Sequence, residues 1–242
     1  MTEAAALAAI AFLGALIFGI TGFGAALVTI PLATHLVSLK FALALFVLAD
    51  LAAALSVGLE NPKNAVRAEW TRLVPMIMAG TACGVTLLVN LPREAGMLLL
   101  GLFVLGYAVY ALLARSSSRS IASGWAWAAG FAGGITSTVF GAGGPPYAIY
   151  LSQRGLTREQ FRATLGFATM TSISLRALAF LLTGLLLDPA VWLAAIAVVP
   201  ACLLGIWVAR KIFLGIPRDA LMRAVALLLL ATGASLIFRA VV

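Results

Sequence analysis

Two glycine-rich breaks in apolar stretches are the features of this sequence best suited to binding chemistry. Thr21-Gly22-Phe23-Gly24 interrupts residues 4–37, and Gly141-Ala142-Gly143-Gly144-Pro145-Pro146 interrupts residues 124–151. A helix that starts at such a break has backbone N–H groups without intrahelical partners and a partial positive charge at its N-terminus. Both properties suit an anion, which glycine admits close to the backbone. We therefore predict an anion site at the breaks; the alternative is that Gly and Pro only kink membrane helices for packing.

Hydroxyl side chains next to the breaks would add hydrogen-bond donors to such a site. Thr21 adjoins the first break, and three hydroxyl residues in a row precede the second. The predicted substrate-binding residues at the two breaks are Thr21, Gly22, Phe23, Gly24, Thr136, Ser137, Thr138, Gly141, Gly143, Gly144 and Pro145.

Arg176 and Asp50 are charged residues in the middle of apolar segments, where a charge is usually functional. They occupy equivalent positions when Gly58-Leu59 is aligned with Gly184-Leu185. Arg176 either binds an anionic substrate or is neutralised by Asp50, and both can hold in different transport states. We add Arg176 to the substrate-binding residues and predict that Asp50 takes up a coupling proton or sodium ion.

His35 is a second residue predicted to take part in coupling, because imidazole can relay protons near neutral pH. It lies near the outer end of a short helix, so the alternative is that it is an interfacial residue. The sequence has no HExxH, Walker P-loop or GxSxG motif, and one His and eight acids leave little for a metal site. We therefore predict no enzyme activity, no cofactor and no bound metal.

The composition indicates which elements must position these residues. Hydrophobic residues make up 63% of the 242 positions, charged residues make up 10%, and the mean hydropathy is +1.12. So few charges cannot cover a soluble surface, and we predict an all-α, polytopic membrane protein. The net charge of +8 is spread over short loops, which argues against a nucleic-acid partner. Each interrupted stretch is expected to form two short helices, and the expected spanning helices are 41–59, 73–89, 95–114, 161–187, 189–209 and 220–238.

Short matches recur in the same order about 120 residues apart and predict an internal repeat. Leu91-Pro92-Arg93-Glu94 corresponds to Ile216-Pro217-Arg218-Asp219, and Phe23-Gly24-Ala25 corresponds to Phe140-Gly141-Ala142. The predicted units are a first membrane repeat at 1–114, a cytoplasmic connecting loop at 115–123 and a second membrane repeat at 124–242.

The charges of the loops predict how the repeats are oriented, because cytoplasmic loops are rich in Lys and Arg. Placing the basic loops inside makes 12 of the 16 Lys and Arg residues cytoplasmic and leaves Lys40, Arg93 and Arg239 outside. Each broken pair then enters and returns on one side, as a re-entrant pair, and each repeat adds three crossings. An odd number of crossings makes the repeats inverted and puts both termini outside, an arrangement typical of secondary transporters.

At the breaks the sequence resembles the sulfite exporter TauE/SafE family, also called the TSUP transporters. The resemblance is carried by Gly19-Ile20-Thr21-Gly22-Phe23-Gly24 followed by Pro31, and by Gly133-Gly134-Ile135 through Phe140-Gly141-Ala142-Gly143-Gly144-Pro145-Pro146. It covers nearly the whole chain, including length and repeat spacing. The first half departs from the family's run of consecutive glycines, which leaves its ligand contacts less defined than those of the second half.

The resemblance implies a secondary transporter that exports or takes up small sulfur-containing anions, such as sulfite or organosulfonates, across a bacterial inner membrane. The partners of such a protein are the lipid bilayer, the small anion and a coupling proton or sodium ion. Whether the protein forms a homodimer stays an open question at this point. Two readings from other classes also stay open. One is a channel or transporter for a neutral or cationic solute that uses Asp50, and the other is a membrane scaffold that transports nothing.

Overall fold

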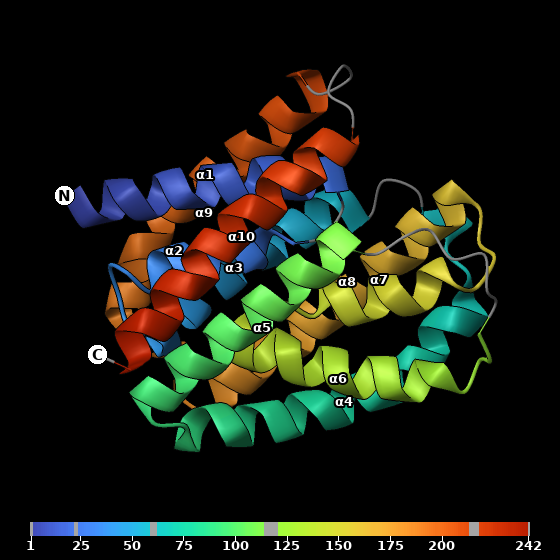
Figure 1. The fold of residues 1–242 in the computed structure, drawn as a ribbon, viewed down its shortest axis with the longest axis horizontal. Coiled ribbons are helices and arrows are strands. Elements are labelled where there is room, and N and C mark those ends of the chain that lie inside the picture. The colour runs from blue at the N-terminus through green and yellow to red at the C-terminus, as the bar shows by residue number, and fades with distance from the viewer. Residues whose placement is uncertain (1, 22–23, 59–61, 114–120, 213–217, 242) are drawn as a thin grey trace.

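The computed structural model describes residues 2–21, 24–58, 62–113, 121–212 and 218–241, and this part of the chain is helical without strands (Figure 1). The first half contains α1 (Thr2–Thr21), α2 (Ala25–Ala33), α3 (Leu39–Gly58), the short 3-10 turn η1 (Pro62–Asn64), α4 (Arg67–Asn90) and α5 (Arg93–Leu113). The second half contains α6 (Trp125–Phe140), α7 (Gly144–Ser152), α8 (Arg158–Leu182), α9 (Pro189–Ile212) and α10 (Arg218–Val241).

Six of the described helices, α1, α3, α4, α5, α8 and α9, are long and apolar enough to cross a membrane. Large apolar side chains such as Leu182, Leu193 and Ile196 are more than two-thirds exposed, as expected for positions that face lipid. The structure confirms the all-α, polytopic prediction. The expectation of two short helices at the first break was wrong, because α1 runs for 20 residues before the chain turns and only α2 is short.

The two halves pack through equivalent helix pairs, which brings α4 against α6 and α1 against α9. Glycine makes both contacts close: a Cβ on Gly80 would lie 2.2 Å from the Phe131 oxygen, and one on Gly205 would lie 2.6 Å from the Phe12 oxygen. Small residues at helix crossings allow this approach in membrane proteins. The repeat predicted from the sequence therefore has a counterpart in the packing.

Helices α5 and α10, which are equivalent in the repeat, run in opposite directions. Gly101 of α5 lies against Ile237 of α10, and Leu105, further along α5, lies against Gly233, which is earlier in α10. This antiparallel packing is the relation expected of inverted repeats. Figure 1 also shows the two marked chain ends at the same end of the bundle. The unit boundaries at 114 and 124 stay a prediction, since 114–120 lie outside the described residues.

Helix α3 lies at the centre of the bundle. In its apolar window, 61% of the residues are buried, compared with 28–39% for the other five candidate spans. It packs against α8, its equivalent in the second half, and against α2 and α9. The two intramembrane charges, Asp50 and Arg176, are therefore carried by two neighbouring helices at the junction of the repeats.

Candidate functional site

The second break is a tight helix end followed at once by a new helix. Helix α6 ends at Phe140 and is capped by Gly141, whose φ of 75° is in the left-handed region that glycine adopts without strain. The Ala142 N–H donates to the Thr136 carbonyl at 3.1 Å, which satisfies an acceptor at the end of α6. Helix α7 starts at Gly144, and the prolines that follow bring no N–H groups that would need partners. Its free N-terminal donors are thus the amides around Gly143 and Gly144.

The first break also has a glycine in the left-handed region, directly before its short helix. Gly24 precedes α2 with a φ of 92°, and its carbonyl accepts from the Leu27 N–H at 3.2 Å. Gly22, Phe23 and the side chain of Thr21, all predicted to bind substrate, lie outside the described residues. Helix α2 folds back along α1, with Thr29 packed against Gly14. Each break therefore starts a nine-residue helix that returns beside the one before it.

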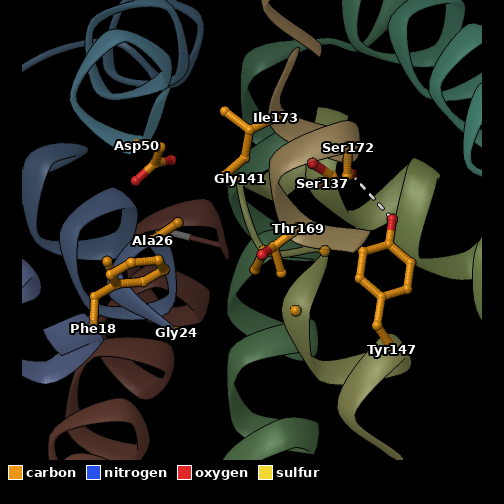
Figure 2. A pocket seen from close by; sticks show the side chains of 14 residues that line it. Phe18, Gly24, Ala26, Asp50, Ser137, Gly141, Tyr147, Thr169, Ser172 and Ile173 are labelled. Atoms are coloured by element: carbon orange, nitrogen blue, oxygen red, sulfur yellow. Dashed lines mark hydrogen bonds between the residues drawn. The ribbon is translucent and has the colours of Figure 1, made fainter. Parts of the chain in front are cut away.

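Both breaks line one cavity of about 30 Å³ between the two halves (Figure 2). The first half lines it with Phe18, Gly24, Ala25, Ala26 and Asp50, and the second half with Ser137, Gly141, Ala142, Gly143, Gly144, Tyr147, Thr169, Ser172 and Ile173. The N-terminal turns of α2 and α7 thus meet at the same space. Figure 2 shows the hydroxyl side chains on one side and Phe18, Ala26 and Asp50 on the other.

Arg176 and Asp50 form a buried ion pair beside this cavity. The Arg176 Nη2 donates to Asp50 Oδ2 at 2.6 Å, and Nη1 donates to the Ser137 carbonyl at 2.8 Å. The arginine is 1% exposed, and its Nε has no hydrogen-bond partner in the described part of the chain. An unpaired charge here would cost several kcal/mol, so each residue needs the other in this conformation. Asp50 lines the cavity, whereas Arg176 lies behind its wall.

The structure brings some predicted site residues to the cavity and places others away from it. Gly24, Ser137, Gly141, Gly143 and Gly144 line it. The hydroxyls of Thr136 and Thr138 donate to their own helix, to the carbonyls of Gly133 and Gly134, and Pro145 does not line the cavity.

His35 also lies apart from the cavity, at the end of α2. Its Nδ1 is 2.9 Å from the Pro31 carbonyl oxygen, and its Nε2 is 3.0 Å from the Ser235 hydroxyl of α10. The side chain is therefore placed to join α2 to α10 rather than to contact a ligand at the breaks.

Sequence reasoning missed the polar side chains Tyr147, Thr169 and Ser172 at the cavity. Thr169 and Ser172 precede Arg176 by seven and four residues, so all three lie on one face of α8. That spacing was a usable signal. Tyr147 had no comparable signal, because its position depends on how α7 folds back against α6 and α8.

A polar cluster holds the other end of α7. It consists of Glu69 and Arg72 on α4, Tyr150 on α7 and Arg154 just beyond it, and we call it the Glu69 cluster. The buried Glu69 carboxylate accepts from Arg154 at 2.9 and 3.1 Å, from Arg72 at 3.2 Å and from the Tyr150 hydroxyl. Helix α7 thus has its N-terminus at the cavity and its C-terminal end in an ionic cluster.

A bundle of apolar helices in which two helix breaks meet at one cavity defines a polytopic membrane protein with a cavity between its two halves. The sequence matches the family described as Sulfite exporter TauE/SafE over residues 7–236, nearly its whole length, and the chain belongs to this family. Comparisons with curated proteins and with solved structures give no match. Family membership indicates a membrane transporter of sulfur compounds and not an enzyme.

Proposed function

We propose that this protein is a secondary transporter of a small sulfur-containing anion, such as sulfite or an organosulfonate, which binds in the cavity between the breaks. The observation that carries the proposal is the meeting of the α2 and α7 N-termini at one cavity. Each helix N-terminus is equivalent to about half a positive charge, so the two together offset about one negative charge. The backbone and the cavity hydroxyls supply the donors that oxygen atoms of the anion accept.

Asp50 couples this anion to a proton in the same proposal. Its carboxylate lines the cavity and would repel an anion, while its pairing with Arg176 leaves the two with no net charge. A proton on Asp50 removes the repulsion and leaves the positive charge of Arg176 for the substrate. Cys202 of α9 is a further titratable group close to this position, since its thiol contacts the carbonyl of Ala49, the residue before Asp50, at 3.6 Å. Anion and proton would then cross together.

A cation or neutral solute is the second candidate, because one carboxylate oxygen of Asp50 has no hydrogen-bond partner in the described part of the chain. That oxygen could bind a cation if Arg176 kept hold of the other. The two helix N-termini at the same cavity oppose this, since their partial charges repel a cation. The anion is therefore the favoured ligand.

The proposal is tested with purified protein in liposomes that are loaded with unlabelled sulfite and given radiolabelled sulfite outside. We expect uptake above that of empty liposomes, competition by sulfoacetate, and faster uptake when the outside is more acidic. Uptake of a labelled cation with no uptake of any sulfur anion would favour the second candidate. An absence of flux with every solute would leave a scaffold role and contradict transport.

A further inference from the structure

The hydroxyl protons of the cavity can be followed from donor to acceptor. Among the described residues, four hydroxyl side chains line it, from Ser137, Tyr147, Thr169 and Ser172. The Thr169 hydroxyl donates to the Leu165 carbonyl of its own helix at 2.9 Å. The Tyr147 hydroxyl donates to the Ser172 Oγ at 3.0 Å, as the dashed line in Figure 2 shows. Only the protons of Ser137 and Ser172 therefore have no acceptor in the described part of the chain.

Tyr147 is fixed in this arrangement by its packing. It is 0% exposed, and its ring lies directly on α6, where a Cβ on Gly133 would be only 2.0 Å from the ring. A tyrosine ring has few rotatable bonds, so a fully buried ring that packs against a helix backbone keeps its hydroxyl in one place. The hydroxyl of Ser172, by contrast, can turn about its own bond. The fixed Tyr147 hydroxyl therefore limits the orientations that the Ser172 hydroxyl can adopt.

The constrained serine lies next to the N-terminus of α7. A Cβ on Gly143 would lie 3.2 Å from the Ser172 Oγ and 2.8 Å from the Ser137 Cβ. The two side chains with uncommitted protons thus both lie next to Gly143, which lines the cavity. An oxyanion at this point would meet donors from α6, α7 and α8 together.

We infer that Tyr147 is a positioning residue for substrate: by donating to the Ser172 oxygen, it leaves the Ser172 proton to be donated to an oxygen of the transported anion. This inference rests on the proposed function. Because the phenol is the donor in this hydrogen bond, the Ser172 proton is not used between the two side chains and can be donated to the ligand. The Ser172 hydroxyl beside Gly143 then acts as a donor, which favours a ligand with an oxygen that accepts.

The test compares variants in proteoliposomes with radiolabelled sulfite and separates the half-saturating concentration from the maximal rate. Tyr147→Phe keeps the ring and removes the hydroxyl, and Ser172→Ala removes the donor itself. Each is expected to raise the half-saturating concentration about tenfold, the size expected for one hydrogen bond to a charged group, with little change in maximal rate. Tyr110→Phe is the matched control, because Tyr110 lies on α5 and is 43% exposed, and it should behave like wild type.

The double variant Tyr147→Phe/Ser172→Ala decides whether the tyrosine acts through the serine. The inference predicts that it is no weaker than Ser172→Ala alone, whereas independent roles would make the two losses add. A wild-type half-saturating concentration in Tyr147→Phe, or additive losses, would overturn it. If Tyr147→Phe fails to fold, wild-type affinity in Ser172→Ala overturns it equally well. An absence of uptake by the wild-type protein contradicts the proposed function instead, so the two failures are distinguishable.

Discussion

Arg176 connects the two halves of the molecule, since one side chain reaches Asp50 in the first half and the Ser137 carbonyl in the second. Arg176→Gln would leave a buried carboxylate without its counter-charge. We expect a loss of about 3–5 kcal/mol in stability, the usual result of removing one partner of a buried pair. A thermal-unfolding measurement in detergent checks this, and it should find Asp50→Asn/Arg176→Gln more stable than Arg176→Gln alone.

The same variants separate the two roles considered for Arg176. If the arginine also attracts substrate when Asp50 is protonated, the double variant should fold but transport poorly, and Arg176→Lys should be intermediate because it loses the two-pronged guanidinium. Asp50→Asn should mainly remove the dependence of uptake on pH. Wild-type uptake by a folded Asp50→Asn/Arg176→Gln variant would make the pair purely structural.

Gly143 is a residue at which one added carbon should stop function. A Cβ there would lie 2.9 Å from the Gly133 carbonyl oxygen, which belongs to a helix backbone and cannot give way like a side chain. Gly143→Ala and Gly143→Val should therefore abolish sulfite uptake and lower stability, by about 1–3 kcal/mol for the overpacking of a tight site. Uptake assays combined with thermal unfolding measure both effects.

The control for Gly143 is Gly106→Ala. No atom lies within 4 Å of the added carbon at that position, and it is inside helix α5. Alanine is about 0.5–1 kcal/mol better than glycine in a helix, so this variant should be as stable as wild type or more so, with normal uptake. Equal uptake by Gly143→Ala and Gly106→Ala would contradict the importance of the second break.

At the scale of residues, the sequence predicted the two breaks and the buried charges because each violates an expectation for an apolar helix. A charge in a bilayer and a cluster of glycines before prolines are visible without a structure. Tyr147 violates nothing, since a tyrosine in a membrane helix is ordinary. Its significance comes from Gly133 and Ser172, which approach it only after α7 has folded back.

At the scale of elements, the two short helices differ in how firmly they are held. Eight of the nine residues of α2 are buried, compared with five of nine in α7. Helix α2 packs against α10, whereas a groove of about 300 Å³ lies between α5 and α7, the equivalent pair. The sequence could not predict this difference, because both short helices are apolar and begin at similar glycines. It depends on which neighbours the packing brings.

Helix α7 is therefore the short helix better placed to move, and the Glu69 cluster holds its C-terminal end. Arg154→Gln removes two of the hydrogen bonds to Glu69 but leaves those from Arg72 and Tyr150. We expect this change to expose the cavity more often from the end of the bundle where the cluster lies. Labelling of an introduced Ala142→Cys by a membrane-impermeant thiol reagent measures this, in a background with Cys83 and Cys202 replaced.

The expected result is several-fold faster labelling of Ala142→Cys from the cytoplasmic side, with unchanged labelling from the outside. Arg158→Gln is the matched control, because Arg158 is an exposed arginine at the start of α8 and should leave labelling as it was. Unchanged labelling in Arg154→Gln would show that the Glu69 cluster does not restrain α7. Faster labelling from both sides would indicate general loosening of the fold.

At the scale of the whole molecule, two kinds of evidence support inverted repeats without depending on each other. The charge bias uses only Lys and Arg positions, with 12 of 16 in loops assigned to the cytoplasm. The antiparallel contact of α5 with α10 uses only packing. Because the repeats are about 120 residues apart in sequence, neither local propensity nor periodicity could reveal that contact. The charges of the loops could predict that equivalent helices run in opposite directions, but not which helices pack against each other.

The topology itself is the last prediction. With the basic loops inside, a cysteine at Asn64, in the turn before α4, should react with an impermeant reagent only from the cytoplasm. A cysteine at Asp188, between α8 and α9, should react only from outside. Both variants are made in the background without Cys83 and Cys202, and labelling is compared in intact cells and inverted vesicles. Three crossings, α4, α5 and α8, separate the two positions, because the α6–α7 pair returns to its own side. An α6–α7 pair that crossed the membrane once would make four, which would put both positions on one side. Labelling of both cysteines from one side would mean that α6 and α7 together cross the membrane, and the repeats would then be parallel.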